Sequence, residues 1–70
     1  MPYATNTELP ASVRHHLPER VQDIFREVFN GAWSTYAGRQ SREQIAHRVA
    51  WAAVKKRYRK LGREWVPYRR

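Results

Sequence analysis

The feature that most constrains this fold is a set of eight apolar residues between positions 21 and 36, spaced alternately three and one residues apart. This spacing puts every member of the set on one face of an α-helix. The dipeptide Asn30-Gly31 favours a different structure, a tight β-hairpin turn. Eight apolar positions in register outweigh a glycine that costs a helix about 1 kcal/mol, so we predict one long helix that ends at Gly38 in the left-handed conformation. The eight residues are Val21, Ile24, Phe25, Val28, Phe29, Ala32, Trp33 and Tyr36.

A second long helix is predicted to begin at Ser41, and its two halves differ in character. Ser41 and Gln44 match a capping box, in which the side chain of each residue bonds the backbone of the other. The first three turns are apolar nearly all round, which indicates nearly complete burial, whereas beyond Val54 the helix is basic until Gly62 ends it. Because residues 37–40 are a short connection, the two long helices must be neighbours. The apolar residues are Ile45, Ala46, Val49, Ala50, Trp51, Ala52, Ala53 and Val54, and only Tyr58 and Leu61 continue the buried stripe.

The remaining segments are short. Pro10 and Pro18 each suit the start of a helix, and the residues between them are enough for about two turns. The C-terminal tail is predicted to be extended, with Pro67 limiting it to an edge strand, and it can pair with the extended segment 1–5. We therefore expect a mainly α fold: one small domain over residues 1–70, with a short N-terminal helix, two long packed helices and a minor two-stranded ribbon from the chain ends.

Positive charge is concentrated in the second half of the chain. Residues 1–38 carry three arginines against four carboxylates, whereas residues 39–70 carry eleven lysines or arginines against two carboxylates. One or two cations at a helix C-terminus complement the helix dipole, but six within nine residues exceed that need and predict an anion-binding surface. At helical spacing, Arg48, Lys55 and Arg59 fall on one line. The predicted binding residues are Arg48, Lys55, Lys56, Arg59, Lys60, Arg63, Tyr68, Arg69 and Arg70.

Several function classes are disfavoured by what the sequence lacks. With no cysteine, three histidines and one aspartate, it offers no metal-binding motif, and His47 beside apolar residues is typical of a hydrogen-bonded structural histidine. No nucleophile motif, paired carboxylates or phosphate-binding glycine loop is present, so we expect neither an enzyme nor a cofactor. The longest apolar run, Val49–Val54, is far shorter than the roughly 20 residues of a membrane-spanning helix. Since the first residues also lack the features of a secretion signal, we expect a cytoplasmic protein.

The sequence also resembles the ChaB family, whose name refers to the regulation of cation transport. The similarity extends over nearly the whole chain. It implies a small, mostly helical domain with a minor extended element, which acts beside a cation/proton antiporter and has no established catalytic residues. The matching segments are Met1-Pro2-Tyr3, Leu9-Pro10 with Val13, Leu17-Pro18, Gln22-Asp23-Ile24, Phe29-Asn30, Ala32-Trp33, Tyr36, Ser41-Arg42-Glu43, Ala46-His47, the run from Val49 to Lys55, and Tyr58.

Two functions from different classes follow from these patterns. The resemblance implies a non-enzymatic regulator that docks on a partner protein, such as the acidic cytosolic face of an antiporter. The charge distribution favours a nucleic-acid-binding module, because aromatic residues alternate with basic ones in the last fourteen residues, RYRKLGREWVPYRR. Both hypotheses use the same basic surface and the same anionic class of partner.

Overall fold

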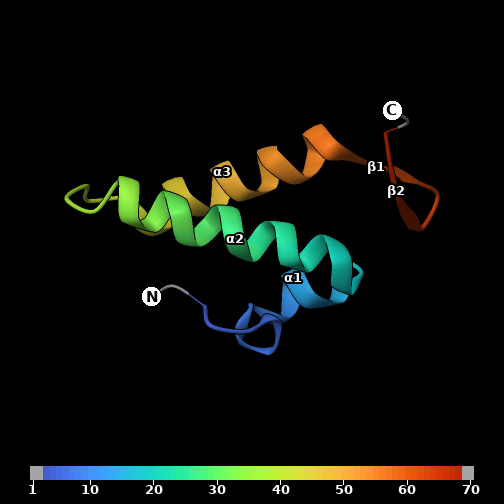
Figure 1. Cartoon of the computed structure of the whole chain (residues 1–70), viewed down its shortest axis with the longest axis horizontal. Helices are drawn as coiled ribbons and strands as arrows, with labels where there is room; N and C mark the ends of the chain where they lie inside the picture. Colours follow the sequence, from blue (N-terminus) through green and yellow to red (C-terminus); the bar gives the residue numbers. More distant parts are fainter. Residues whose placement is uncertain (1–2, 69–70) are drawn as a thin grey trace.

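The structure, a computed structural model, describes residues 3–68 and is mainly helical (Figure 1). Two long helices, α2 and α3, run antiparallel side by side, α1 packs near the start of α2, and an antiparallel ribbon follows α3. The predicted fold class, with a short N-terminal helix, two long packed helices and a two-stranded ribbon, is confirmed. The elements are η1 (Asn6–Glu8), α1 (Ala11–His16), α2 (Glu19–Thr35), α3 (Arg42–Arg57), β1 (Tyr58–Leu61) and β2 (Glu64–Pro67).

The buried residues of the core recur at about every fourth position along the chain. Side chains from the N-terminal half meet a narrow stripe of α3 formed by Ala46, Ala50 and Val54, all with no exposed surface. Small side chains on α3 let its backbone lie close to the rings of Phe25 and Phe29, which fill the space between the helices. The buried residues of the N-terminal half are Leu9, Val13, Leu17, Val21, Phe25, Phe29 and Ala32.

Only one side of α3 is enclosed, so the expectation that its first turns are buried nearly all round is wrong. Ala52 is exposed, and Val49 and Trp51 are half-buried. The physical reason is that a single neighbouring helix, α2, covers α3 and leaves its other side facing water (Figure 1). Alanine on that side adds helix propensity without needing burial.

Helix α2 continues through Asn30 and Gly31, so the helix prediction is confirmed and the hairpin alternative is wrong. The side-chain amide of Asn30 accepts a hydrogen bond from the Tyr3 backbone N–H at 2.9 Å and donates one to the Tyr3 carbonyl at 2.8 Å. The asparagine therefore pairs with a distant extended segment in the way that a peptide group pairs across a β-ladder. This tertiary contact explains why an asparagine stands inside α2, although the dipeptide Asn30-Gly31 is typical of a hairpin turn.

The N-terminal segment lies along α2 and is held there by further polar contacts. Asn6 accepts a hydrogen bond from Arg26 Nε and donates one to Asp23, both at 2.7 Å. The Tyr3 ring packs on Phe29 with 4.9 Å between centroids. Burial, and secondarily the Glu43 carboxylate, raises the pKa of the Tyr3 hydroxyl above its usual value. The segment is thus anchored to α2, with the Tyr3 ring packed against the helical core.

The ribbon exists, but its strands are not the two chain ends. Helix α3 stops at Arg57, and β1 pairs with β2 so that Lys60 lies opposite Trp65. Gly62 adopts a positive φ of 60° in the turn, and it does not end a helix as predicted. A longer helix would place lysines and arginines four residues apart along its last two turns, where they repel one another. The hairpin instead packs Tyr58 and Trp65 against the core.

The connection between the long helices also differs from its prediction. Helix α2 ends at Thr35, and Gly38 does not adopt the left-handed conformation. Ser41 precedes α3 without any side-chain capping bond, because its backbone is not in the extended conformation that directs a capping hydroxyl. Arg42 joins the helices: its Nε donates to the Trp33 carbonyl at 2.8 Å, and its guanidinium lies 4.0 Å from the Trp33 ring centroid.

Replacing glycine with alanine is expected to have opposite effects on stability inside α2, at Gly31, and in the ribbon turn, at Gly62. Gly31→Ala is expected to raise the free energy of unfolding by about 0.5–1 kcal/mol, because a helical alanine loses less entropy than glycine and nothing lies within 4 Å of the added Cβ. Gly62→Ala is expected to lower it by about 1 kcal/mol, because its φ is positive. Urea unfolding followed by circular dichroism measures both. Destabilisation by Gly31→Ala would contradict a continuous α2.

The contact between Asn30 and Tyr3 is tested by removing the side-chain N–H donor of Asn30. Asn30→Asp keeps one acceptor but loses the hydrogen bond to the Tyr3 carbonyl, so we expect a loss of about 1–3 kcal/mol in the free energy of unfolding. Gln40→Glu makes the same charge change at an exposed residue of the connection and serves as the control. Equal melting curves for the two variants would show that the Asn30 amide does not hold the N-terminal segment.

Candidate anion-binding surface

Six cationic side chains gather where α3 passes into the ribbon, and we name this cluster the basic end. All six are exposed. Within residues 3–68 the sole ion pair joins Arg26 to Asp23, at 3.7 Å, so no carboxylate of the described residues forms an ion pair with the basic end, although Glu64 lines one groove together with Arg63. Its field is therefore available to an anionic partner. The six residues are Lys55, Lys56, Arg57, Arg59, Lys60 and Arg63.

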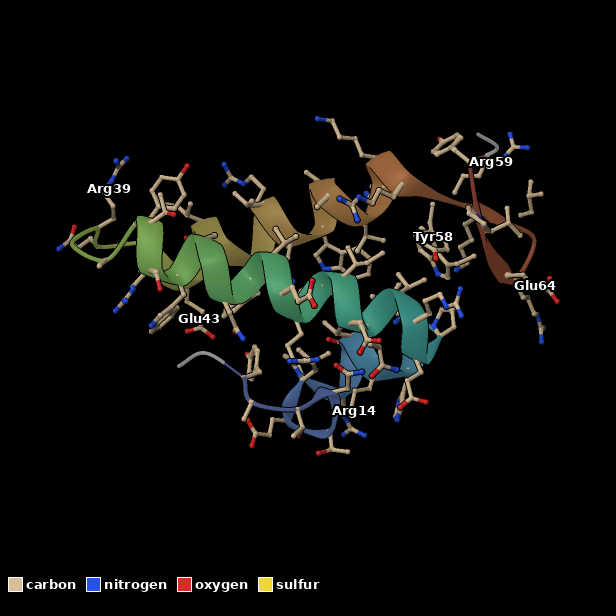
Figure 2. All side chains as sticks on the ribbon, viewed as in Figure 1. Arg14, Arg39, Glu43, Tyr58, Arg59 and Glu64 are labelled. Atoms are coloured by element: carbon tan, nitrogen blue, oxygen red, sulfur yellow. The ribbon has the colours of Figure 1, made fainter. Side chains whose placement is uncertain are left out.

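The ribbon distributes consecutive cations onto opposite faces, as side chains alternate along a strand. Lys60 lies opposite Trp65, while Arg59 lies opposite Val66. In Figure 2 the side chains of Tyr58 and Arg59 point to opposite sides of the ribbon. The guanidinium of Arg59 lies 5.7 Å from the Tyr68 ring centroid. Since residue 59 belongs to a strand, the prediction that Arg48, Lys55 and Arg59 share one line of a helix is wrong.

Trp65 fixes the inner face of the ribbon against the helices. Its indole N–H donates to the His16 carbonyl at 2.9 Å, which joins residues 49 positions apart. Its ring contacts Trp51 with 6.3 Å between centroids and an angle of 39° between planes. Trp51 in turn meets Phe25 of the core edge-on at 5.5 Å. The basic end therefore rests on an aromatic support that is continuous with the core.

His47 belongs to this aromatic support. Its Nε2 accepts a hydrogen bond of 3.0 Å from the Trp51 indole N–H, one helical turn away, and its ring meets Phe25 edge-on at 5.5 Å. An accepting Nε2 places the proton of the neutral imidazole on Nδ1. The expectation of a hydrogen-bonded structural histidine is confirmed.

Three shallow grooves meet at Trp51 and Trp65. One follows the outer side of α3, a second lies between α1, α3 and the ribbon, and a third lies between the end of α1 and the ribbon turn. The first two share Trp51 and Lys55, and the last two share His16 and Trp65. We name the second the Trp51–Trp65 groove, which is lined by Ser12, His16, Trp51, Lys55, Lys60 and Trp65.

The structure distributes the predicted binding residues over these features. Arg48 and Lys55 line the groove on α3, Lys60 lines the Trp51–Trp65 groove, and Arg63 lines the third groove. Lys56, Arg59 and Tyr68 are exposed, whereas Arg69 and Arg70 lie outside the described residues.

Sequence reasoning missed Trp51, Trp65 and His16 as lining residues. The alternation of aromatic and basic residues in the tail was a signal for Trp65. No local pattern indicates His16, because its place beside the ribbon depends on a contact between distant segments.

Neither a metal site nor a membrane span is visible in the part of the chain that the structure describes. Within residues 3–68, no three histidine, aspartate or glutamate side chains gather as metal ligands do. None of the helices of residues 3–68 combines the length and the apolar character needed to cross a bilayer.

Comparison with known proteins gives a consistent family assignment. The family model ChaB matches residues 9–68. Proteins named "Putative cation transport regulator ChaB" from Escherichia coli K12 and Shigella flexneri are each 52% identical to this chain, over 86% of it and 87% of the relative. An NMR solution structure of a protein of the same name superposes with a TM-score of 0.82 at 45% identity, over 97% of this chain and 100% of the other. The chain therefore belongs to the ChaB family.

Proposed function

We propose that this protein is a non-enzymatic regulatory binding protein of the cytoplasm, which docks through its basic end on an acidic face of a partner protein. The relatives are named for cation transport regulation, which supports a transport protein, such as a cation/proton antiporter, as that partner. Arg48 and Tyr68 extend the docking surface on either side of the basic end, and the tail residues Arg69 and Arg70 add to its charge.

The observation that carries this proposal is the absence of internal carboxylate partners for the basic end within residues 3–68. Clustered like charges on a folded chain repel one another, so they lower stability unless an anionic partner uses them. Complementary charge across an interface accelerates association and rejects partners of the wrong sign. The contact between Trp51 and Trp65 holds the ribbon against α3 before a partner binds, and an interface that is already ordered has a lower entropic cost of docking.

Nucleic acid is the second candidate partner, and the ribbon is the observation that favours it. A two-stranded β-ribbon fits the major groove of DNA, and this ribbon carries Arg59, Lys60 and Arg63 on or beside its turn. The aromatic residues favour it less. Trp51 and Trp65 are half-buried and in contact with each other, whereas base stacking uses freely accessible ring faces.

Binding titrations over a salt series distinguish the two candidates. We expect a fluorescently labelled acidic peptide to bind in low salt, and the double variant Lys55→Glu, Lys56→Glu to bind at least about tenfold more weakly, because attraction becomes repulsion. The double variant Arg39→Glu, Gln40→Glu lowers the net charge by three, against four for the first variant, at exposed residues of the connection between α2 and α3, which lies at the other end of the helix pair from the basic end (Figure 1). It should bind nearly as well as the unaltered protein. Fluorescence anisotropy measures each affinity.

A short DNA duplex in the same titration provides the competing outcome. Contacts with phosphates give a log–log salt slope near −0.9 per contact. One alternative result is that the duplex binds more tightly than the acidic peptide, with binding lost in the Lys55→Glu, Lys56→Glu variant and kept in the control variant. That result would replace the protein-docking hypothesis by the nucleic-acid hypothesis. Equal losses for the two double variants would show that net charge alone, and not the basic end, determines binding.

A further inference from the structure

We infer that the Trp51–Trp65 groove receives one bulky apolar side chain of the acidic partner segment, while carboxylates on either side of that side chain meet Lys55 and Lys60. This inference rests on the proposed function, because it specifies how an acidic protein segment would be recognised. Lys55 comes from the last turn of α3 and Lys60 from β1, so two elements present charge to the same groove.

The floor of the groove recognises apolar surface and not polar groups. Both indole N–H groups are already used inside the chain, by the His47 ring and by the His16 carbonyl. The half-buried rings of Trp51 and Trp65 therefore offer carbon surface without a free donor. Such a floor gains free energy by covering apolar area, as a leucine or phenylalanine side chain would do.

The rim of the groove complements negative charge. Its lining includes two lysines and one histidine, with no aspartate or glutamate among the residues that form it. Lysine stems add apolar surface beside the tryptophans while the ammonium groups stay in water. An apolar side chain flanked by carboxylates matches this combination, whereas an apolar segment without charge leaves the lysines unused.

The geometry of the two rings is less suited to a nucleobase. Their planes are inclined by 39° and their centroids lie 6.3 Å apart in mutual contact, so no base fits between them. Trp51 is additionally packed edge-on against Phe25. A three-dimensional aliphatic or aromatic side chain can fill an inclined floor, but a planar base stacks best on a parallel ring face.

Nuclear magnetic resonance tests this inference directly, because each tryptophan gives one indole N–H signal. The probes are two synthetic acidic peptides, identical except for a central leucine or alanine flanked by glutamates. We expect the leucine peptide to shift the signals of Trp51 and Trp65 but not that of Trp33. Trp33 belongs to the last turn of α2, and this end of α2 lies away from the ribbon (Figure 1). The alanine peptide should bind about tenfold more weakly, as expected for loss of one buried leucine side chain.

Two matched lysine variants separate the groove from the basic end as a whole. Lys60 lines the groove, whereas Lys56 is exposed and lines none of the three grooves. We expect Lys60→Glu to weaken binding of the leucine peptide about tenfold, and Lys56→Glu less than about threefold, because rim charges matter most beside the anchor. Circular dichroism confirms that each variant is folded, and Lys55→Glu provides a second groove variant from α3.

Each other outcome gives a definite conclusion. Equal affinity for the leucine and alanine peptides, with unmoved indole signals, overturns the groove inference and leaves docking by charge intact. Absence of binding for both peptides in low salt overturns the proposed function together with the inference. A single-stranded oligonucleotide that shifts the Trp51 and Trp65 signals and binds more tightly than the leucine peptide overturns the inference in favour of base stacking.

Discussion

The packing of Phe25 and Phe29 on the alanine stripe of α3 is the interaction on which the rest of the structure depends. A chain of 70 residues without cysteine has one small core and no disulfide to reinforce it. Both rings are fully enclosed, and Ala46 and Ala50 have no exposed surface. This close approach forms the helix pair against which the N-terminal segment and α1 pack. Larger residues in the stripe would separate the helices and remove the aromatic support of the basic end.

Much of the fold was predictable because the helical faces are local patterns. The spacing from Val21 to Tyr36 predicted α2 correctly, even through Asn30 and Gly31, and the prolines at 10 and 18 immediately precede α1 and α2. What escaped prediction depends on contacts between distant segments. The ribbon forms because Trp65 packs on Trp51 and bonds the backbone of α1. Hence helix propensity in residues 58–61 was overridden by tertiary packing.

In the candidate site, too, local features were predictable and those that depend on distant contacts were not. The sequence showed that six cations gather within residues 55–63, more than helix capping requires. It could not place them, because a helix repeats about every 3.6 residues and a strand every two. That change of period puts Arg59 and Lys60 on opposite faces and gives Lys60 a groove in common with Lys55. Charge was predictable from composition, whereas shape required the correct secondary structure.

The junction between α3 and β1 contains no linker. Tyr58 still bonds its N–H to the Val54 carbonyl of the helix, while Tyr68 at the other end of the hairpin bonds the carbonyl of Arg57. Both ends of the hairpin are therefore hydrogen-bonded to the last turn of α3. A partner that binds only the folded ribbon also stabilises the helix end to which the ribbon is bonded, including the buried Val54. Occupancy of the surface should therefore raise the melting temperature of the core.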